Sequence, residues 1–180
     1  TTEIYTLSLH DALPISISYG VATIAKALTI PRGTRVVVLE NDHSSPVLEW
    51  HARAEAQGFV IDTVPQPADG DWTSAVLATI ERSAAPPVGL ASISSVHWSD
   101  GGIIDVDRVQ TALRRQGAMF AIDATQSAGV VAMDVTKLDP DAVIFPRSSC
   151  KMIQALPLLE SGAADAARLN GLLIASGFNV

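Results

Sequence analysis

Apolar residues in the middle of the chain follow two different spacings. Val21, Ile24 and Leu28 recur at helical intervals, and Ser18 precedes them as a possible helix cap. Residues 35–40 read RVVVLE, a valine-rich run that is typical of a buried strand. The two patterns then alternate, with further helices expected over residues 44–58, 71–80 and 105–117 and further strands over residues 59–64, 88–96, 118–122 and 142–145.

Polar residues, proline and glycine mark the expected ends of these helices. Pro46 follows two serines and suits the first turn of a helix, where the missing N–H costs nothing. Asp71 and Asp105 stand where an N-cap is needed, and Gly58 and Gly117 stand where a helix would end in the left-handed conformation.

The alternation predicts an α/β fold. One strand and one helix recur every ~30 residues, which is the length of a βαβ crossover. We therefore expect a three-layer αβα domain with a mostly parallel sheet. Ligands of such sheets lie beyond the carboxyl ends of the strands, so the residues of interest are 42–43, 97–100, 123–126 and those from 146 onward.

Composition limits the classes of partner. Hydrophobic residues make up 48% of the 180 residues and charged residues 17%, so a packed core is expected. The net charge of -7 and the absence of a Lys/Arg-rich run argue against nucleic acid. No apolar run approaches the ~20 residues that span a bilayer, so we expect no membrane partner. The single cysteine, Cys150, fits a reducing, cytoplasmic location.

Asp123 is the sharpest candidate for chemistry, because its carboxylate follows an apolar strand directly. An acid at this position binds a metal, a ribose or a protonated ring nitrogen, or it caps a turn; no metal site is predicted. His43 taken alone fits a turn or a partly buried residue equally well. The chain has no glycine-rich dinucleotide or phosphate loop, which leaves a nucleotide binder with Glu40 on the ribose as a weak alternative.

Four segments resemble motifs of one family and occur in that family's order. Residues 121–127 read AIDATQS and residues 96–101 read VHWSDG. Residues 139–146 read DPDAVIFP and residues 16–20 read SISYG. Together they resemble the class V aminotransferases, which include cysteine desulfurases, kynureninases and isopenicillin-N-epimerase-like proteins. These are fold-type I enzymes that use pyridoxal phosphate (PLP) as cofactor.

The resemblance implies roles for residues around the cofactor ring. Asp123 would hold the protonated ring nitrogen, Gln126 would donate to the phenolic oxygen, and His43 would stack on the ring. Trp98 stands where desulfurases usually have asparagine, which favours the aminotransferase-like or epimerase-like branch. We expect these four side chains to converge on one cleft at the carboxyl edge of the sheet.

The resemblance also implies a phosphate site at the start of the first helix. Ser18 and the amides of Tyr19 and Gly20 would hold the phosphate there, because free N–H groups and the helix dipole favour an anion.

The chain departs from the family at its lysine. The resemblance places a Schiff-base lysine three residues after Pro146, but Ser149 stands there and Lys151 comes two residues late. Lys26 and Lys137 lie elsewhere, so Lys151 is the remaining candidate. We expect it to point away from the cleft, so that PLP binds weakly and without a covalent bond.

The two ends of the chain do not share the regular pattern. Residues 1–15 resemble translated sequencing-adapter DNA, with an ordinary N-terminal arm as the alternative, and we expect them to add little to the core. We assign residues 16–146 to part of a PLP-binding large domain. Residues 147–180 are expected to be a non-family tail, either frameshifted or genuinely divergent.

These observations give one main functional hypothesis and one alternative. The chain is expected to be a fragment of a PLP-dependent enzyme that acts on an amino acid through a Schiff base, and to be inactive by itself. The resemblance implies that the parent enzyme is a homodimer. The alternative is a non-catalytic α/β module that binds a phosphorylated small molecule.

Overall fold

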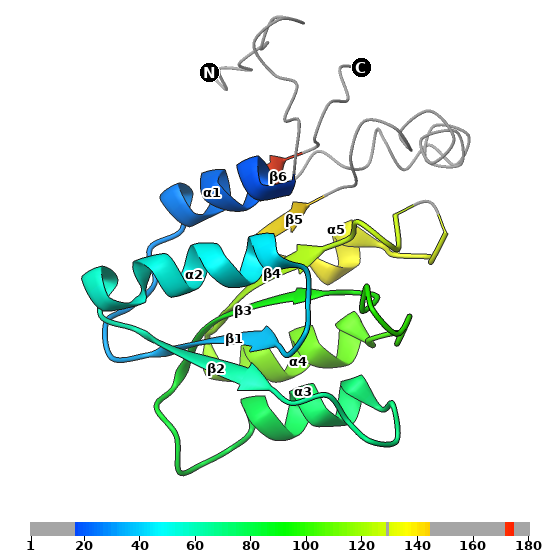
Figure 1. Ribbon diagram of the computed structural model, residues 1–180, viewed down its shortest axis with the longest axis horizontal. Coiled ribbons are helices and arrows are strands. Elements are labelled where there is room, and N and C mark those ends of the chain that lie inside the picture. The colour runs from blue at the N-terminus through cyan, green and yellow to red at the C-terminus, as the bar shows by residue number, and fades with distance from the viewer. Residues whose placement is uncertain (1–16, 129, 145–171, 175–180) are drawn as a thin grey trace, which may run out of the picture.

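The strands form one parallel sheet with helices on both faces, as Figure 1 shows. The structure is a computed structural model, and it describes residues 17–128, 130–144 and 172–174. The expected α/β fold with three layers is confirmed. Residues 1–15 and Lys151, on which two of the expectations above depend, lie outside the described residues.

The described residues contribute six strands to the sheet, in the order β2-β1-β3-β4-β5-β6. Every neighbouring pair is parallel. The bounds are β1 (Arg35–Leu39), β2 (Val60–Val64), β3 (Val88–Ser94), β4 (Met119–Asp123), β5 (Ala142–Ile144) and β6 (Leu172–Ile174). Because β2 and β3 lie on opposite sides of β1, the direction of winding reverses between β1 and β3.

The helices divide between the two faces as right-handed crossovers require. Helices α1 (Ile17–Ala27) and α2 (Ser44–Gln57) lie on one side of the sheet in Figure 1. Helices α3 (Trp72–Ile80), α4 (Val106–Gln116) and α5 (Val135–Leu138) lie on the other side.

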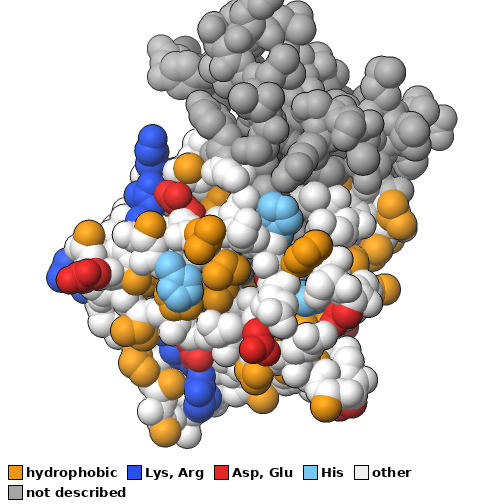
Figure 2. Space-filling model, in the orientation of Figure 1, with side chains coloured by type: hydrophobic (Ala, Val, Ile, Leu, Met, Phe, Trp, Pro, Cys, Tyr) orange, Lys and Arg blue, Asp and Glu red, His pale blue; other side chains and the backbone are white. Residues whose placement is uncertain are grey.

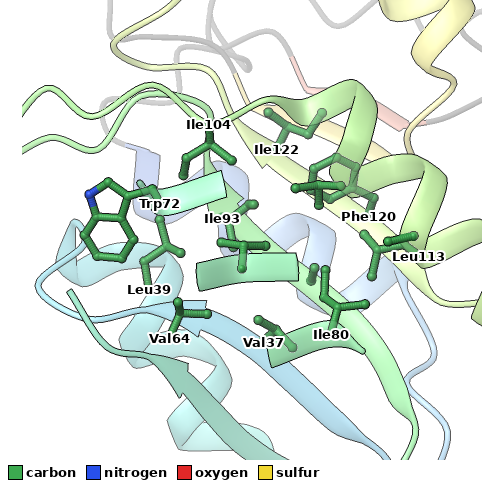
Figure 3. Close-up of a cluster of buried hydrophobic side chains, with 14 of the residues drawn as sticks. Val37, Leu39, Val64, Trp72, Ile80, Ile93, Ile104, Leu113, Phe120 and Ile122 are labelled. Carbon is green, nitrogen blue, oxygen red and sulfur yellow. The ribbon is translucent and has the colours of Figure 1, made fainter. Parts of the chain in front are cut away.

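Each face of the sheet has its own apolar core. Figure 3 shows the core between the sheet and α3 and α4, which includes Trp72 and Ile80 of α3, Val37 of β1 and Phe120 of β4. On the opposite face Trp50 of α2 packs with Ile24 of α1 and with the strands beneath. The strands β1 and β3 are buried throughout, as their apolar sequences predict.

The expected helix ends are largely confirmed. The side chains of Asp71 and Asp105 accept hydrogen bonds from backbone N–H groups at the starts of α3 and α4. Gly58 and Gly117 end α2 and α4 with positive φ angles of 76° and 64°. One detail differs: α1 begins at Ile17, so Ser18 lies in its first turn rather than before it.

Two short elements were not predicted from the sequence. Helix α5 has four residues and strand β6 has three, which is too short for either period to be recognised. Strand β6 belongs to the segment assigned above to the tail, yet it pairs in parallel with β5. Within the described part of the chain, no helix is long and apolar enough to cross a membrane.

Candidate functional site

Polar residues follow the carboxyl ends of three neighbouring strands. Asp42 and His43 come after β1, Trp98 comes after β3, and Asp123 ends β4. Because all three strands are parallel, these residues lie at the same edge of the sheet. The winding of the sheet reverses between β1 and β3, and open α/β sheets bind their ligands at such a switch point.

Asp123 is a buried carboxylate on the face covered by α1 and α2. Ala121, two positions earlier on β4, packs in the core on that face, and alternate strand residues share a face. Asp123 is 3% exposed, and its Oδ1 accepts a hydrogen bond of 2.8 Å from the N–H of Thr125. Its Oδ2 has no hydrogen-bond partner among the described residues.

Burial raises the pKa of Asp123 to about 6, because a carboxylate loses its hydration inside the protein. The hydrogen bond from the N–H of Thr125 lowers the pKa, and the charge of Asp42 raises it further. Asp123 therefore stays ionised near neutral pH with one oxygen open to a hydrogen-bond donor. Buried acids of this kind are concentrated at functional sites.

The turn after Asp123 adds two more buried polar atoms. Thr125 Oγ1 and Gln126 Oε1 also have no hydrogen-bond partner among the residues that the structure describes. Buried polar groups in proteins are nearly always paired, so three such atoms within four residues require an explanation. A ligand that brings hydrogen-bonding groups to this turn would supply one.

Asp42 lies next to Asp123 across β3. Its two carboxylate oxygens each lie 2.8 Å from the hydroxyl of Ser94, and it also accepts the N–H groups of Ser94 and His43. Ser94 is the register partner of Asp123 on the adjacent strand. The sequence placed Asp42 among the strand-end residues but assigned no role to it or to Ser94, because neither belongs to a recognisable motif.

The starts of α1 and α2 meet at this edge. The hydroxyl of Ser18 lies 2.7 Å from that of Ser45, in the first turn of α2. The N–H groups of the first turn of a helix have no partner within the helix, so they can hold an anion. Gly20 is buried, and the side chain of Tyr19 lies outside what the structure describes. Sequence reasoning did not single out Ser45.

His43 and Trp98 contact each other beside the switch point. Their ring centroids are 6.1 Å apart in an edge-on arrangement, and the indole N–H of Trp98 donates to the carbonyl of Asn41 at 2.6 Å. Trp98 is 53% exposed. The structure thus brings His43 into contact with Trp98 and places Asp123 and Gln126 in one turn at the same edge of the sheet, and the roles expected for them stay predictions.

His97, which also follows a strand, contributes to packing and hydrogen bonding between two loops. It is buried and stacks on Trp72 at 4.3 Å between ring centroids. Its two ring nitrogens contact Asp100 and the carbonyl of Glu40. The exposed side chain of Glu40 accepts the N–H of Gln66, away from the Asp123 turn. These contacts hold the loop after β3 against the loop after β1.

Among the described residues, no group of three or more His, Cys, Asp or Glu side chains is placed to hold a metal ion. On the face seen in Figure 2, Lys and Arg side chains are scattered among acidic ones rather than gathered in one patch. The ligand chemistry of this edge is therefore that of buried carboxylates, hydroxyls and helix starts.

Sequence relatives of this chain are named as cysteine desulfurases. Cysteine desulfurase IscS of Pseudomonas entomophila is 30% identical over 114 residues, which are 63% of this chain and 27% of that protein. A probable cysteine desulfurase of Pyrococcus abyssi is 27% identical over the same shares. The chain thus spans about a quarter of the length of these curated relatives.

Solved structures share the fold. The cysteine desulfurase CsdA of Escherichia coli has a TM-score of 0.63 at 19% identity, with 73% of this chain and 33% of that chain covered. A C-DES variant whose title describes glycine covalently linked to the PLP cofactor has a TM-score of 0.61 at 20% identity, with 72% and 34% covered.

The family assignment rests on a match over most of the chain. The model of the family Aminotransferase class-V, a family that depends on PLP, matches residues 17–154. The match includes every site residue discussed above and extends to the segment that contains Lys151. The chain therefore belongs to the class-V aminotransferase family.

Proposed function

We propose that residues 16–146 form the PLP-binding unit of an enzyme that acts on an amino acid. The observation that carries the proposal is the buried carboxylate of Asp123, whose second oxygen has no hydrogen-bond partner among the described residues. A protonated ring nitrogen is the partner that this oxygen fits, because it supplies both a donor and a positive charge. When bound, PLP supplies an electron sink for carbanions at the substrate's α-carbon.

The neighbouring residues fit the rest of the cofactor. The side-chain N–H of the half-buried Gln126 can donate to the phenolic oxygen, and His43 offers a ring face braced by Trp98. Ser18 and the amides of Tyr19 and Gly20 lie at the start of an 11-residue helix, where a phosphate is favoured.

The finer functional assignment also belongs to the proposal. The relatives are named cysteine desulfurases, which makes cysteine the first substrate to test, whereas Trp98 favours a different branch of the family. We propose a homodimeric, cytoplasmic parent enzyme. Residues 1–15 and 147–180 are proposed to lie outside the PLP-binding unit. Ser149 stands at the family's lysine position, and we propose that Lys151, two residues later, forms no bond with the cofactor.

The exchange Asp123→Asn tests the cofactor assignment. It keeps the shape of the side chain but removes the charge that would pair with the ring nitrogen. We expect PLP to bind about 10- to 100-fold more weakly, as for the loss of a hydrogen bond to a charged group. Asp107→Asn is the matched control, because Asp107 is exposed in the first turn of α4 on the opposite face.

Each protein is titrated with PLP in a calorimeter, and the dissociation constants are compared. Equal affinities for the wild type and Asp123→Asn would contradict the proposal. If, in addition, Ser18→Ala weakened PLP binding, the results would favour the alternative, a module that binds a phosphorylated small molecule at the helix starts. The contact between Ser18 and Ser45 is the observation that supports this second candidate.

Covalent trapping tests the assignment of Lys151 separately. The chain is incubated with PLP, reduced with borohydride and digested for peptide mass spectrometry. We expect no pyridoxyl adduct at Lys151 above the level of the surface lysine Lys26. A high yield at Lys151 would show that this chain retains the amine on which covalent catalysis depends.

A further inference from the structure

Asp42 accepts hydrogen bonds with both of its carboxylate oxygens. It is 9% exposed, and its partners among the described residues are all donors: the hydroxyl and N–H of Ser94 and the N–H of His43. An ionised carboxylate only accepts hydrogen bonds, so this set of donors suits the charged form. The charge is thus fixed in place by the protein itself.

Asp123 has the opposite environment. It receives one hydrogen bond, from the N–H of Thr125, and its second oxygen has no partner among the described residues. Two neighbouring carboxylates with unequal environments take different roles. Donors within the fold serve both oxygens of Asp42, whereas the second oxygen of Asp123 can accept a donor from a ligand.

Ser94 places the two carboxylates side by side. It ends β3 and pairs in register with Asp123 on β4, and neighbouring parallel strands lie about 4.8 Å apart. Leu90, four positions earlier on β3, packs on the α1 and α2 face, so the side chain of Ser94 points to the same face as Asp123. The order along the sheet edge is therefore Asp42, Ser94, Asp123.

We propose that Asp42 is a positioning residue that, held by Ser94, makes the Asp123 position selective for a ligand ring with a protonated nitrogen. The inference rests on the proposed function and deepens it. A fixed negative charge beside Asp123 penalises a neutral partner there and favours a cationic one. A neutral ring of the same shape would leave two buried carboxylates together without a compensating charge.

A purely structural role for Asp42 would not require its charge. Tying the loop after β1 to the end of β3 needs acceptors for Ser94 and His43, and an asparagine oxygen would serve. A second buried carboxylate beside Asp123 instead adds like-charge repulsion, which the fold maintains without an arginine or lysine hydrogen-bonded to either acid in the described region. The repulsion is relieved by a bound cation.

The test measures selectivity rather than activity. The full chain is titrated by calorimetry with PLP and with its carbocyclic analogue, in which a C–H group replaces the ring nitrogen. The proteins are the wild type, Asp42→Asn and the control Asp107→Asn, with thermal unfolding as a check of folding. Asp42→Ser, which also removes the charge and keeps a hydroxyl near Ser94, replaces Asp42→Asn if that variant does not fold.

We expect the wild type to prefer PLP over the carbocyclic analogue and Asp42→Asn to lose about tenfold or more of that preference. Most of the change should be weaker binding of PLP, while Asp107→Asn keeps the wild-type ratio. An unchanged ratio in the folded, uncharged Asp42 variant overturns the inference and leaves the proposed function standing. A wild type that binds neither compound overturns both.

Discussion

Asp123 combines near-complete burial with a carboxylate oxygen that no described residue satisfies. A buried charge of this kind destabilises the folded chain, and residues retained at such a cost are characteristic of binding and catalytic sites. The cost has a measurable consequence, because the pKa of Asp123 differs between the folded and unfolded chain.

The raised pKa predicts how stability depends on pH. Between pH 3.8, the ordinary pKa of an aspartate, and about pH 6, the folded chain holds a proton on Asp123 that the unfolded chain has lost. The free energy of unfolding should therefore fall as the pH rises through this window. The loss above pH 6 is about 3 kcal/mol, because each pKa unit corresponds to ~1.4 kcal/mol.

Asp123→Asn should remove this loss. We expect the variant to be more stable than the wild type at pH 7.5, by up to about 3 kcal/mol, and the advantage to shrink toward pH 4. Urea unfolding of both proteins at each pH measures the difference, and effects of pH on the rest of the chain cancel. A constant difference between pH 4 and 7.5 would show that the pKa is not raised by folding.

At the scale of elements, glycines shape the ends of helices and the loops beside the site. Gly117 ends α4 at a φ of 64°, and a Cβ there would meet no atom within 4 Å. Gly102, in the loop after β3, has no positive φ, but a Cβ there would overlap Cδ1 of the buried Trp72. The two glycines are required for different reasons.

The two reasons predict different losses on exchange to alanine. Gly117→Ala should cost about 1 kcal/mol, which is the backbone penalty for a left-handed alanine. Gly102→Ala should cost about 2–3 kcal/mol, because it forces Trp72 from its stack on His97. Thermal and urea unfolding of the two variants measure both values. Equal losses would mean that Trp72 moves aside without strain.

At the scale of the whole molecule, the carboxyl edge and the amino edge of the sheet differ in how their polar groups are hydrogen-bonded. The carboxyl edge carries the turn from Asp123 to Gln126 with its three buried, unpaired polar atoms, whereas the amino edge carries a hydrogen-bonded network around Arg35. Arg35 is 2% exposed, donates to the carbonyls of Pro86 and Ile80, and forms an ion pair with Asp62. It thereby joins β1, β2 and the connection between α3 and β3.

Arg82 supplies a matched comparison, because it pairs with the same oxygen of Asp62 but is half exposed. Arg35→Ala should lower the free energy of unfolding by about 2–3 kcal/mol, since it removes a buried side chain and its hydrogen bond to the carbonyl of Pro86, and leaves Asp62 paired with the half-exposed Arg82. Arg82→Ala should cost no more than about 1 kcal/mol, as exposed ion pairs do. Similar losses in urea unfolding would mean that the network does not depend on burial.

Local chemistry in the sequence determined the alternation of elements and several of their ends. The valine-rich β1, the caps Asp71 and Asp105 and the terminal Gly58 and Gly117 were all recognised, because each acts through neighbours within a few positions. Parallel pairing followed from the alternation, and it placed Asp123 and His43 at one edge of the sheet before any contact was known.

The tertiary structure alone decided what surrounds those residues. The strand order puts the switch point between β1 and β3. The contact between Ser18 and Ser45 joins positions 27 residues apart, and the hydrogen bond between Asp42 and Ser94 joins positions 52 residues apart. No local pattern encodes such pairs, because they form only when separate elements pack. The burial that raises the pKa of Asp123 is likewise a property of the assembled layers, not of the residue or its strand.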